Sequence, residues 1–166
     1  MIRLLTGSTH TGKTLLAQRL LERHGAPYLS IDHLKMGLIR GGMCPLTPES
    51  TDEALTAVLW PVVREIVKTA VENGQSLTVE GCYIPFNWRE DFDASCLPHI
   101  RFLCLVFSEA YIRTRFDTIQ THANAIERRK DDSFCTMELL LAENRRNLEA
   151  CRRRGLPYYL IDGPYA

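Results

Sequence analysis

The residues best suited to chemistry form the segment GSTHTGKT at positions 7–14, directly after the apolar run IRLL at 2–5. The segment fits the pattern G-x-x-x-x-G-K-[ST] and stands between a strand-like run and a helical pattern, as a phosphate-binding loop requires. Gly7 and Gly12 permit backbone conformations and a close approach that a Cβ would block. Successive backbone N–H groups can then surround a phosphate at the N-terminus of a helix. The segment therefore predicts a phosphate-binding loop.

Each residue of this loop is a candidate phosphate-binding residue: Gly7, Ser8, Thr9, His10, Thr11, Gly12, Lys13 and Thr14. Lys13 adds a positive charge for the β- and γ-phosphates of a nucleotide, and the hydroxyl of Thr14 is placed to hold Mg²⁺. We interpret His10 as a spacer within the loop rather than as a base. The alternative is a chance match in a helix-capping turn that binds no phosphate.

Composition limits the class of protein. With 166 residues, 45% hydrophobic and 24% charged, the chain has the size and composition of one soluble globular domain. Its formal net charge of zero argues against a protein that coats nucleic acid or an anionic membrane. Arg outnumbers Lys sixteen to four, and Arg suits forked contacts with phosphate oxygens, although solvated helix faces account for part of this excess.

The cysteines and the apolar runs indicate the compartment. The six cysteines include no C-x-x-C pair and no set with metal-ligand spacing, and Cys104 lies in an apolar run typical of a core strand. The first strand-like run begins at residue 2, and no apolar run approaches 18 residues, so we expect neither a targeting segment nor a membrane span. These features predict a cytoplasmic protein with reduced thiols.

Strand-like and helical patterns alternate along the chain. We expect strands at 2–6, 27–31, 76–80, 100–107 and 157–162, and helices at 13–24, 33–40, 52–73, 109–120 and 137–153. This alternation predicts βαβ units and a parallel sheet with helices on both faces. The long helix is expected to start at Ser50, with Glu53 three residues later, or at Thr47, before Pro48. No repeat or linker interrupts the pattern, so residues 1–166 are expected to form a single domain.

In such a sheet, ligands bind at the carboxyl ends of the strands, so the residues that follow each strand matter most. The phosphate loop follows the first strand. The residues that follow the next four strands are, in chain order, Asp32, Glu80-Gly81, the pair Arg113 and Arg115, and Asp162-Gly163. Because these strand ends meet at one edge of the sheet, we expect several of these residues to lie beside the phosphate loop. For Asp32 alone, a helix cap is the alternative.

Over its whole length the chain resembles the small P-loop kinases, a superfamily that includes nucleoside monophosphate kinases, shikimate kinases, chloramphenicol phosphotransferases and zeta-toxin-like enzymes. The resemblance rests on GSTHTGKT, on Asp32, on Glu80-Gly81 and on the R-x-R of Arg113 and Arg115. It implies an α/β, three-layer P-loop NTPase fold, with a five-stranded parallel sheet in the order 2-3-1-4-5, flanking helices and a small helical lid at about 113–134. It also implies ATP and Mg²⁺ as cofactors.

The sequence departs from the adenylate-kinase-like members, which carry D-x-L-R after the second strand and D-G-F-P-R after the third. This chain has DHLK at 32–35 and EGCY at 80–83, with no arginine until Arg89. The arginine that would hold a nucleoside monophosphate is therefore missing. The pattern is closer to members that phosphorylate a hydroxyl of a small molecule. A regulatory GTPase would need N-K-x-D, which the sequence lacks.

The resemblance assigns roles to these residues. Lys13 would contact the β- and γ-phosphates, while Thr14 and Glu80 would hold Mg²⁺, Glu80 through the waters that Mg²⁺ usually keeps. Asp32 would be the general base for the acceptor hydroxyl. The arginine that stabilises the transferred phosphoryl group would come from Arg113, Arg115, Arg128 and Arg129, of which the first two are favoured by their position after the fourth strand.

The acceptor-binding candidates are Asp32, Lys35, Arg40, Glu80, Gly81 and Tyr83. Lys35 and Arg40 would bind an anionic acceptor, or else face solvent. Tyr83, Phe86 and Trp88 would wall the acceptor pocket, or else pack in the core. A loop near Asp162-Gly163-Pro164 is expected to bind the nucleotide base.

Three functions stay open. The first is an ATP-dependent phosphotransferase that moves the γ-phosphoryl group to a hydroxyl of a small molecule. The second is a nucleoside or nucleotide kinase, and the third is a non-catalytic ATP-binding regulator. The expected partners are ATP and a small-molecule acceptor, with no membrane and, given the zero net charge, no nucleic acid. The acceptor, the choice of ATP over GTP and the oligomeric state do not follow from the sequence.

Overall fold

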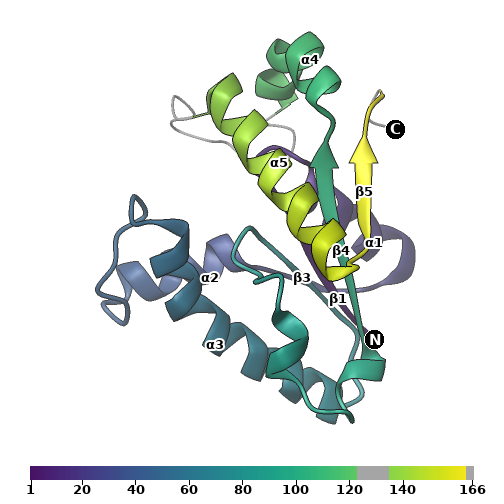
Figure 1. The fold of residues 1–166 in the computed structure, drawn as a ribbon. Helices are drawn as coiled ribbons and strands as arrows, with labels where there is room; N and C mark the ends of the chain where they lie inside the picture. The colour runs from purple at the N-terminus through teal and green to yellow at the C-terminus, as the bar shows by residue number, and fades with distance from the viewer. Residues whose placement is uncertain (123–134, 164–166) are drawn as a thin grey trace.

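A five-stranded sheet forms the centre of the computed structural model, which describes residues 1–122 and 135–163. Its strands are β1 (Ile2–Gly7), β2 (Tyr28–Ser30), β3 (Leu77–Glu80), β4 (Ile100–Phe107) and β5 (Tyr158–Ile161). All neighbouring strands are parallel, and their order is β2-β3-β1-β4-β5, as predicted (Figure 1). Leu5 pairs with Glu80 and Ser30 pairs with Glu80, so the carboxyl ends of β1, β2 and β3 lie close together.

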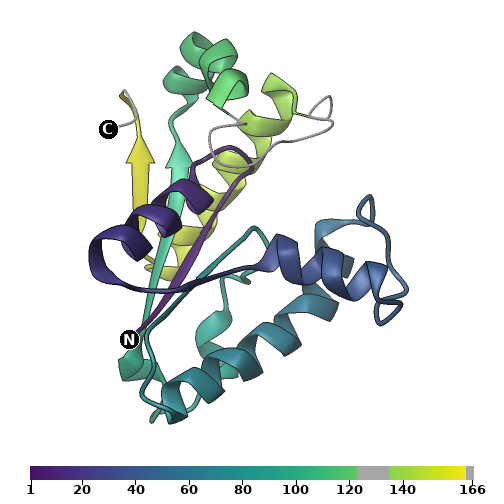
Figure 2. The same ribbon diagram turned by 180° about the vertical axis from the view of Figure 1, so that it is seen from behind.

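Five α-helices connect or cover these strands: α1 (Lys13–His24), α2 (Ile31–Arg40), α3 (Asp52–Glu72), α4 (Glu109–His122) and α5 (Met137–Arg154). Two 3₁₀ turns, Trp88–Asp91 and Leu97–His99, lie between β3 and β4. The two opposite views place α5 on one face of the sheet and α1 on the other (Figures 1 and 2). None of the helices described here combines the length and the apolar content that crossing a membrane requires.

Successive side chains of a strand point to opposite faces of the sheet, and this divides the hydrophobic core into two clusters. Leu4 faces the cluster that contains α3, whereas its neighbour Leu5 faces the cluster that contains α1 and α4. On α3 the buried side chains recur at helical spacing, at positions 55, 59, 63 and 67. Cys104 is fully buried, as expected for a core strand, and all six cysteines are free.

The start of α2 and the N-cap of α3 differ from the sequence-based expectation, although α3 begins at residue 52 as expected. α3 begins after Thr51, whose Oγ1 accepts a hydrogen bond from the backbone N–H of Ala54 at 3.2 Å. Ser50 instead accepts one from the backbone N–H of Thr47 at 3.0 Å, so neither predicted cap starts the helix. α2 follows β2 without an intervening loop, with Ser30 at its N-cap. Asp32 therefore lies in the first turn of α2, and its interpretation as a helix cap was wrong.

Part of the expected lid lies outside the described residues. This part covers 123–134 and includes Arg128 and Arg129, and Pro164 of the expected base-binding loop also falls outside. The first part of the lid, with Arg113 and Arg115, belongs to α4.

Candidate phosphate-binding and transfer site

The phosphate loop connects β1 to α1, and two glycines fix its path. Gly7 has φ of 145°, and a Cβ there would lie 2.4 Å from the carbonyl oxygen of Leu105, so only glycine lets the loop start this close to β4. Gly12 has φ of 81°, in the left-handed region, and is the N-cap of α1. The hydroxyl of Thr11 donates to the carbonyl oxygen of Ser8 at 2.8 Å, which closes the loop. The loop thus leads directly into the N-terminus of α1, where an anion is favoured.

Lys13 is buried at the base of this loop, and its Nζ donates to the carbonyl oxygen of Ser8 at 2.8 Å. Burial alone would lower its pKa, but the neighbouring side chains of Cys82, Glu80 and Asp32 together raise it. The thiol of Cys82 has a raised pKa of its own and is neutral at pH 7, so the negative charges that act on Lys13 are those of Glu80 and Asp32. Lys13 therefore carries a charged ammonium group beside the loop.

Thr14 and Glu80 bring two oxygen donors together at the end of β3. The hydroxyl of Thr14 donates to Oε1 of Glu80 at 3.3 Å, and Glu80 is only 1% exposed. The next residue, Gly81, has φ of 157°, and a Cβ there would lie 2.8 Å from Cβ of Ile31. Because glycine has no Cβ, the first residue of α2 can pack directly against the end of β3. A hydroxyl beside a carboxylate fits Mg²⁺, which prefers oxygen ligands and retains water. These two residues would hold the metal.

Asp32, Lys35 and Tyr83 form a second polar group beside the loop. Nζ of Lys35 donates to Oδ1 of Asp32 at 2.8 Å and to the hydroxyl of Tyr83 at 3.0 Å. The side chain of Lys35 is 13% exposed, whereas that of Asp32 is 46% exposed. Burial would lower the pKa of Lys35, but the charge of Asp32 and these two hydrogen bonds raise it. Lys35 therefore holds Asp32 in place while the carboxylate stays open to solvent.

The other acceptor-binding candidates lie in different surroundings. Arg40 is exposed at the last residue of α2, the opposite end of the helix from Asp32. Trp88 is buried and stacks on Phe102 with ring centroids 6.0 Å apart, and Phe86 packs edge-on against the same ring at 6.3 Å. The structure thus brings Tyr83 to Lys35 and places Trp88 in the core.

Sequence reasoning missed the contribution of α5. Nδ2 of Asn147 donates to Oγ of Ser8 at 3.1 Å, and Oδ1 of Asn144 accepts from the backbone N–H of Phe107 at 2.8 Å. The carboxylate of Glu143 accepts a hydrogen bond from the backbone N–H of Thr9. A signal was present, because two asparagines occur on the face of α5 that also buries Leu140 and Cys151.

Glu143 also experiences the charges of the site. Burial is the main reason why its pKa is raised, and the nearby carboxylate of Asp52 adds to the effect. The hydrogen bond from Thr9, together with Arg146 and Lys13, acts in the opposite direction. Burial and Asp52 together therefore outweigh these favourable interactions, and the pKa of Glu143 lies above its ordinary value.

Cys82 lies among these charged groups, and the sequence analysis gave it no role. Its pKa is raised, first by the protein atoms around it and then by the carboxylates of Asp32, Glu143 and Asp52, while Lys13 lowers it. Its side chain is nevertheless exposed.

A cavity of about 480 Å³ lies on the α4 side of the loop. It is lined by residues of the loop, of α4 and of the end of β5, among them His10, Tyr111, Arg115, Ile119, His122 and Asp162. Asp162 accepts a hydrogen bond from the hydroxyl of Ser108. His10 has φ of 66°, and its Nδ1 lies 2.9 Å from Oγ1 of Thr9 and 3.6 Å from Sγ of Cys135.

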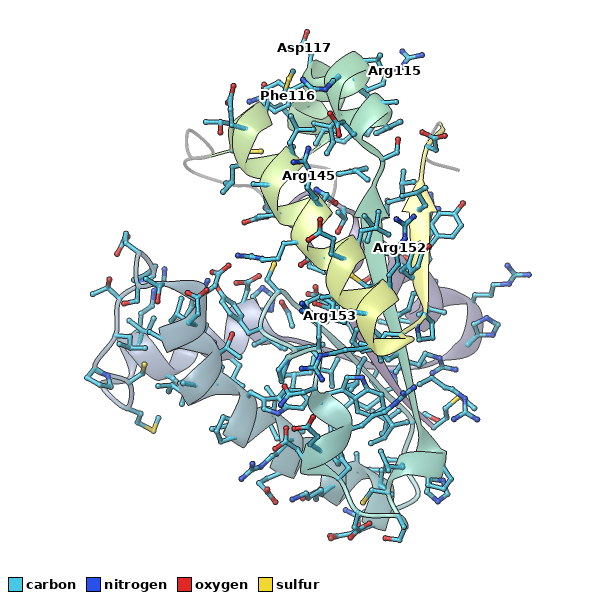
Figure 3. The ribbon with its side chains drawn as sticks, in the orientation of Figure 1. Arg115, Phe116, Asp117, Arg145, Arg152 and Arg153 are labelled. Atoms are coloured by element: carbon cyan, nitrogen blue, oxygen red, sulfur yellow. The ribbon has the colours of Figure 1, made fainter. Side chains whose placement is uncertain are left out.

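The two favoured arginines of α4 are placed differently. Arg113 is exposed and forms an ion pair with Glu109 at 2.8 Å, and Arg145 of α5 lies 3.4 Å from the other oxygen of that carboxylate. Arg115 has φ of −130° and ψ of 21°, which interrupts the helix; its side chain is exposed on α4 (Figure 3), and the residue is among those that line the cavity. Of the pair, Arg115 shares a cavity with the phosphate loop and Arg113 is held at the helix surface.

Comparison with solved structures identifies the fold. A gluconokinase from Sinorhizobium meliloti 1021 is similar over 99% of this chain and 83% of its own, with a TM-score of 0.55 and 17% identity. A sugar kinase from Janibacter sp. HTCC2649 is similar over 98% and 86%, with a TM-score of 0.54 and 18% identity. A shikimate kinase from Bacteroides thetaiotaomicron is similar over 98% and 86%, with a TM-score of 0.55 and 12% identity. The predicted fold of the small P-loop kinases is therefore confirmed.

No protein-family model matches this sequence, and no curated protein matches it either.

Proposed function

We propose that this chain is a kinase that transfers the γ-phosphoryl group of ATP to a hydroxyl of a small molecule. The observation that carries the proposal is the position of Asp32. Its carboxylate is open to solvent, yet close enough to the phosphate-loop Lys13 to raise the pKa of that lysine. A protein that only binds a nucleotide does not need an accessible carboxylate at this position, whereas a phosphotransferase needs a base or an orienting group there.

The reaction would proceed by positioning and charge stabilisation. The loop amides and Lys13 would bind the β- and γ-phosphates, next to the oxygen donors of Thr14 and Glu80. Mg²⁺, when bound, would neutralise negative charge on the phosphates. Asp32 would accept the proton of the acceptor hydroxyl while that oxygen bonds to phosphorus and the bond to the β-phosphate oxygen breaks. Lys35 would keep Asp32 oriented through its hydrogen bond.

The cavity beside the phosphate loop is suited to bind the nucleotide base. It combines the rings of Phe107, Tyr111 and His10 with the carboxylate of Asp162, a hydrogen-bond acceptor. Its volume of about 480 Å³ lies within the range usual for small-molecule sites. Arg115 also lines it, and we propose this arginine, rather than Arg113, as the one that approaches the phosphates.

A nucleotide acceptor is less well supported by the same residues. Lys35 is already engaged by Asp32 and Tyr83. Arg89, the first arginine after Gly81, is exposed and lies over the ring of Trp88 at 5.4 Å. Within the described residues, neither of these two cations is disposed to bind an acceptor phosphate.

The test uses γ-labelled ATP, Mg²⁺ and a panel of small hydroxyl compounds, nucleosides and nucleoside monophosphates, with ATP binding measured separately by calorimetry. Label transfer to a non-nucleotide hydroxyl is the expected result. Transfer to a monophosphate would replace the proposal with the nucleotide-kinase alternative. Binding of ATP with no transfer to any acceptor would favour a regulator.

A further inference from the structure

We infer that Asn147 of α5 is a positioning residue for phosphoryl transfer: it holds the phosphate loop through Ser8 and so sets where the ammonium group of Lys13 lies. This inference rests on the proposed function, because Lys13 is the residue that would contact the phosphates of ATP. Asn147 and Ser8 are separated by 139 positions in the chain, so the loop motif alone does not point to this asparagine.

Ser8 is the residue at which the contacts of the loop meet. Its carbonyl oxygen accepts hydrogen bonds from Oγ1 of Thr11 and from Nζ of Lys13, both at 2.8 Å. Its hydroxyl accepts a third hydrogen bond, from Nδ2 of Asn147 at 3.1 Å. The first two bonds come from the loop and the start of α1, whereas the third comes from a separate helix. A shift of Ser8 would therefore move the oxygen on which Lys13 rests.

Asn147 is well placed to hold Ser8 firmly. Both side chains are buried, and a hydrogen bond inside a protein is stronger than one in contact with water. The helix that carries Asn147 is itself fixed, because α5 lies on one face of the sheet and buries Leu140, Ala150 and Cys151 (Figure 1). The bond thus connects the loop to the packed body of the molecule.

Asn144, one helical turn before Asn147, makes a different kind of contact. Its Oδ1 accepts from the backbone N–H of Phe107 at 2.8 Å, and its Nδ2 donates to the carbonyl oxygen of Leu140 at 2.8 Å. These two bonds fasten α5 to the end of β4 and to its own preceding turn. Asn147 instead bonds to the side chain of a phosphate-loop residue. The two buried asparagines therefore form a matched pair for experiment.

The position of Lys13 matters because phosphoryl transfer depends on where charges stand relative to the phosphates. Without the bond from Asn147, the side chain of Ser8 loses its anchor outside the loop. We then expect Ser8, and Lys13 with it, to move away from the geometry that suits the phosphates. ATP should bind more weakly and transfer should be slower, while the sheet and the helices stay folded.

The first experiment compares Asn147→Leu with Asn144→Leu, since leucine has nearly the shape of asparagine and no amide. In Asn147→Leu the Kd for Mg²⁺-ATP, measured by calorimetry, should rise about tenfold, as for the loss of one buried hydrogen bond. Its kcat, measured by label transfer, should fall by up to about 10²-fold, the effect of a misplacement of about 1 Å. Asn144→Leu should lower Tm at least as much, because it breaks two bonds, yet keep the Kd of the parent protein.

The second experiment asks whether Asn147 acts through Ser8. Ser8→Ala removes the same hydrogen bond from the other side and keeps the carbonyl that accepts from Lys13. The double variant with Asn147→Leu should therefore bind ATP no more weakly than either single variant. Additive losses of affinity would mean that Asn147 acts by another route and would overturn the inference.

A Kd and a kcat in Asn147→Leu equal to those of the parent protein, or equal losses in Asn147→Leu and Asn144→Leu, would also overturn the inference and leave the kinase proposal standing. If Asn147→Leu does not fold, as judged by its thermal unfolding, Ser8→Ala replaces it, and unchanged affinity for ATP in that variant is the contradicting result. Failure of the parent protein to transfer label to any acceptor would overturn the proposed function, and this inference with it.

Discussion

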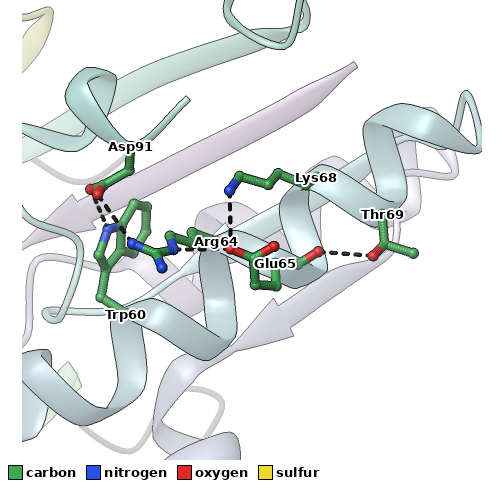
Figure 4. A network of polar contacts seen from close by, with 6 residues as sticks. All are labelled: Trp60, Arg64, Glu65, Lys68, Thr69 and Asp91. Atoms are coloured by element: carbon green, nitrogen blue, oxygen red, sulfur yellow. Dashed lines mark hydrogen bonds and ion pairs between the residues drawn. The ribbon is translucent and has the colours of Figure 1, made fainter. Parts of the chain in front are cut away.

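Two groups of charged side chains in this molecule are built in opposite ways. The first links α3 to the turn after β3: Asp91 accepts from Nε1 of Trp60 at 2.8 Å and from Arg64 at 3.3 Å (Figure 4). Glu65 accepts from Lys68 and from Arg64, both at 3.0 Å. The second group surrounds the phosphate loop, where Lys13 and Glu80 are buried and Asp32 is left open.

The direction of the pKa shifts separates the two groups. The pKa of Glu65 is lowered, because the hydrogen bonds from Lys68 and Arg64 stabilise its charged form. The pKa of Glu143 is raised, because burial and the carboxylate of Asp52 disfavour its charged form. Glu65 is thus stabilised in its charged form by its two cationic neighbours, whereas burial disfavours the charged form of Glu143. This difference gives predictions for both regions.

The largest effect is expected for Lys13→Ala. Loss of the ammonium group at the base of the loop should abolish phosphoryl transfer, because nothing else among the described loop side chains supplies a positive charge to the γ-phosphate. The measurement is label transfer from ATP. Lys68→Ala, which removes a lysine from the α3 group, is the control and should retain full activity. Transfer by the Lys13→Ala protein would refute the kinase proposal.

Asp32→Asn should have the next largest effect. The amide has nearly the same shape but cannot accept the hydroxyl proton, so turnover should fall by about 10²–10⁴-fold, the usual contribution of a general base. Affinity for ATP, measured by calorimetry, should change little. Equal turnover in the variant and the parent protein would mean that Asp32 only pairs with Lys35.

Asp91→Ala should affect stability and leave catalysis unchanged. The indole N–H of the nearly buried Trp60 and the guanidinium of Arg64 would both lose a hydrogen-bond acceptor. Removing the acceptor of a buried donor costs about 1–3 kcal/mol. For a chain of this size, each kcal/mol lowers Tm by about 2–4 °C. Thermal unfolding followed by circular dichroism measures the shift, and a fall in kcat at 25 °C would show that the two regions are coupled.

The smallest effect is expected for the stability of Lys68→Ala. Its ion pair with Glu65 lies at the surface, and exposed pairs contribute about 0–1 kcal/mol. The change in Tm should therefore be close to the error of the measurement and should shrink further in 1 M salt. A decrease as large as that of Asp91→Ala would mean that the α3 group acts as one cooperative network.

The parts of the fold that could be predicted are those that depend on sequence patterns within one element or on the resemblance to a known family. The bounds of α1 and β4 follow from periodicity and from the glycines of the loop, and the sheet order follows from the resemblance. The start of α3 at residue 52 was predicted correctly, but its N-cap was not. Ser50 and Thr51 are both capable caps, and only the backbone decides between them: Thr51 is extended, with φ of −61° and ψ of 151°. Such a choice depends on how the preceding chain packs.

The candidate site was predictable where one motif or one strand end supplies the residue. It was not predictable where partners lie far apart in the sequence. Asn147 and Ser8 are separated by 139 positions, and Lys35 and Tyr83 by 48. Their meeting depends on which helix covers which face of the sheet. The contact of Lys35 with Tyr83 could therefore be recognised only in three dimensions, whereas the pairing of Lys35 with Asp32, three positions away on the same helix, is local.

The direct junction between β2 and α2 has a mechanical consequence. With no loop between Ser30 and Ile31, and with Gly81 packed against Ile31, Asp32 belongs to the same rigid block as Glu80. The distance between the base and the metal-binding oxygens is thus set by the sheet itself, and closure of a lid need not create it. Substitutions that leave this junction intact should therefore leave the spacing of the base and the metal-binding oxygens unchanged.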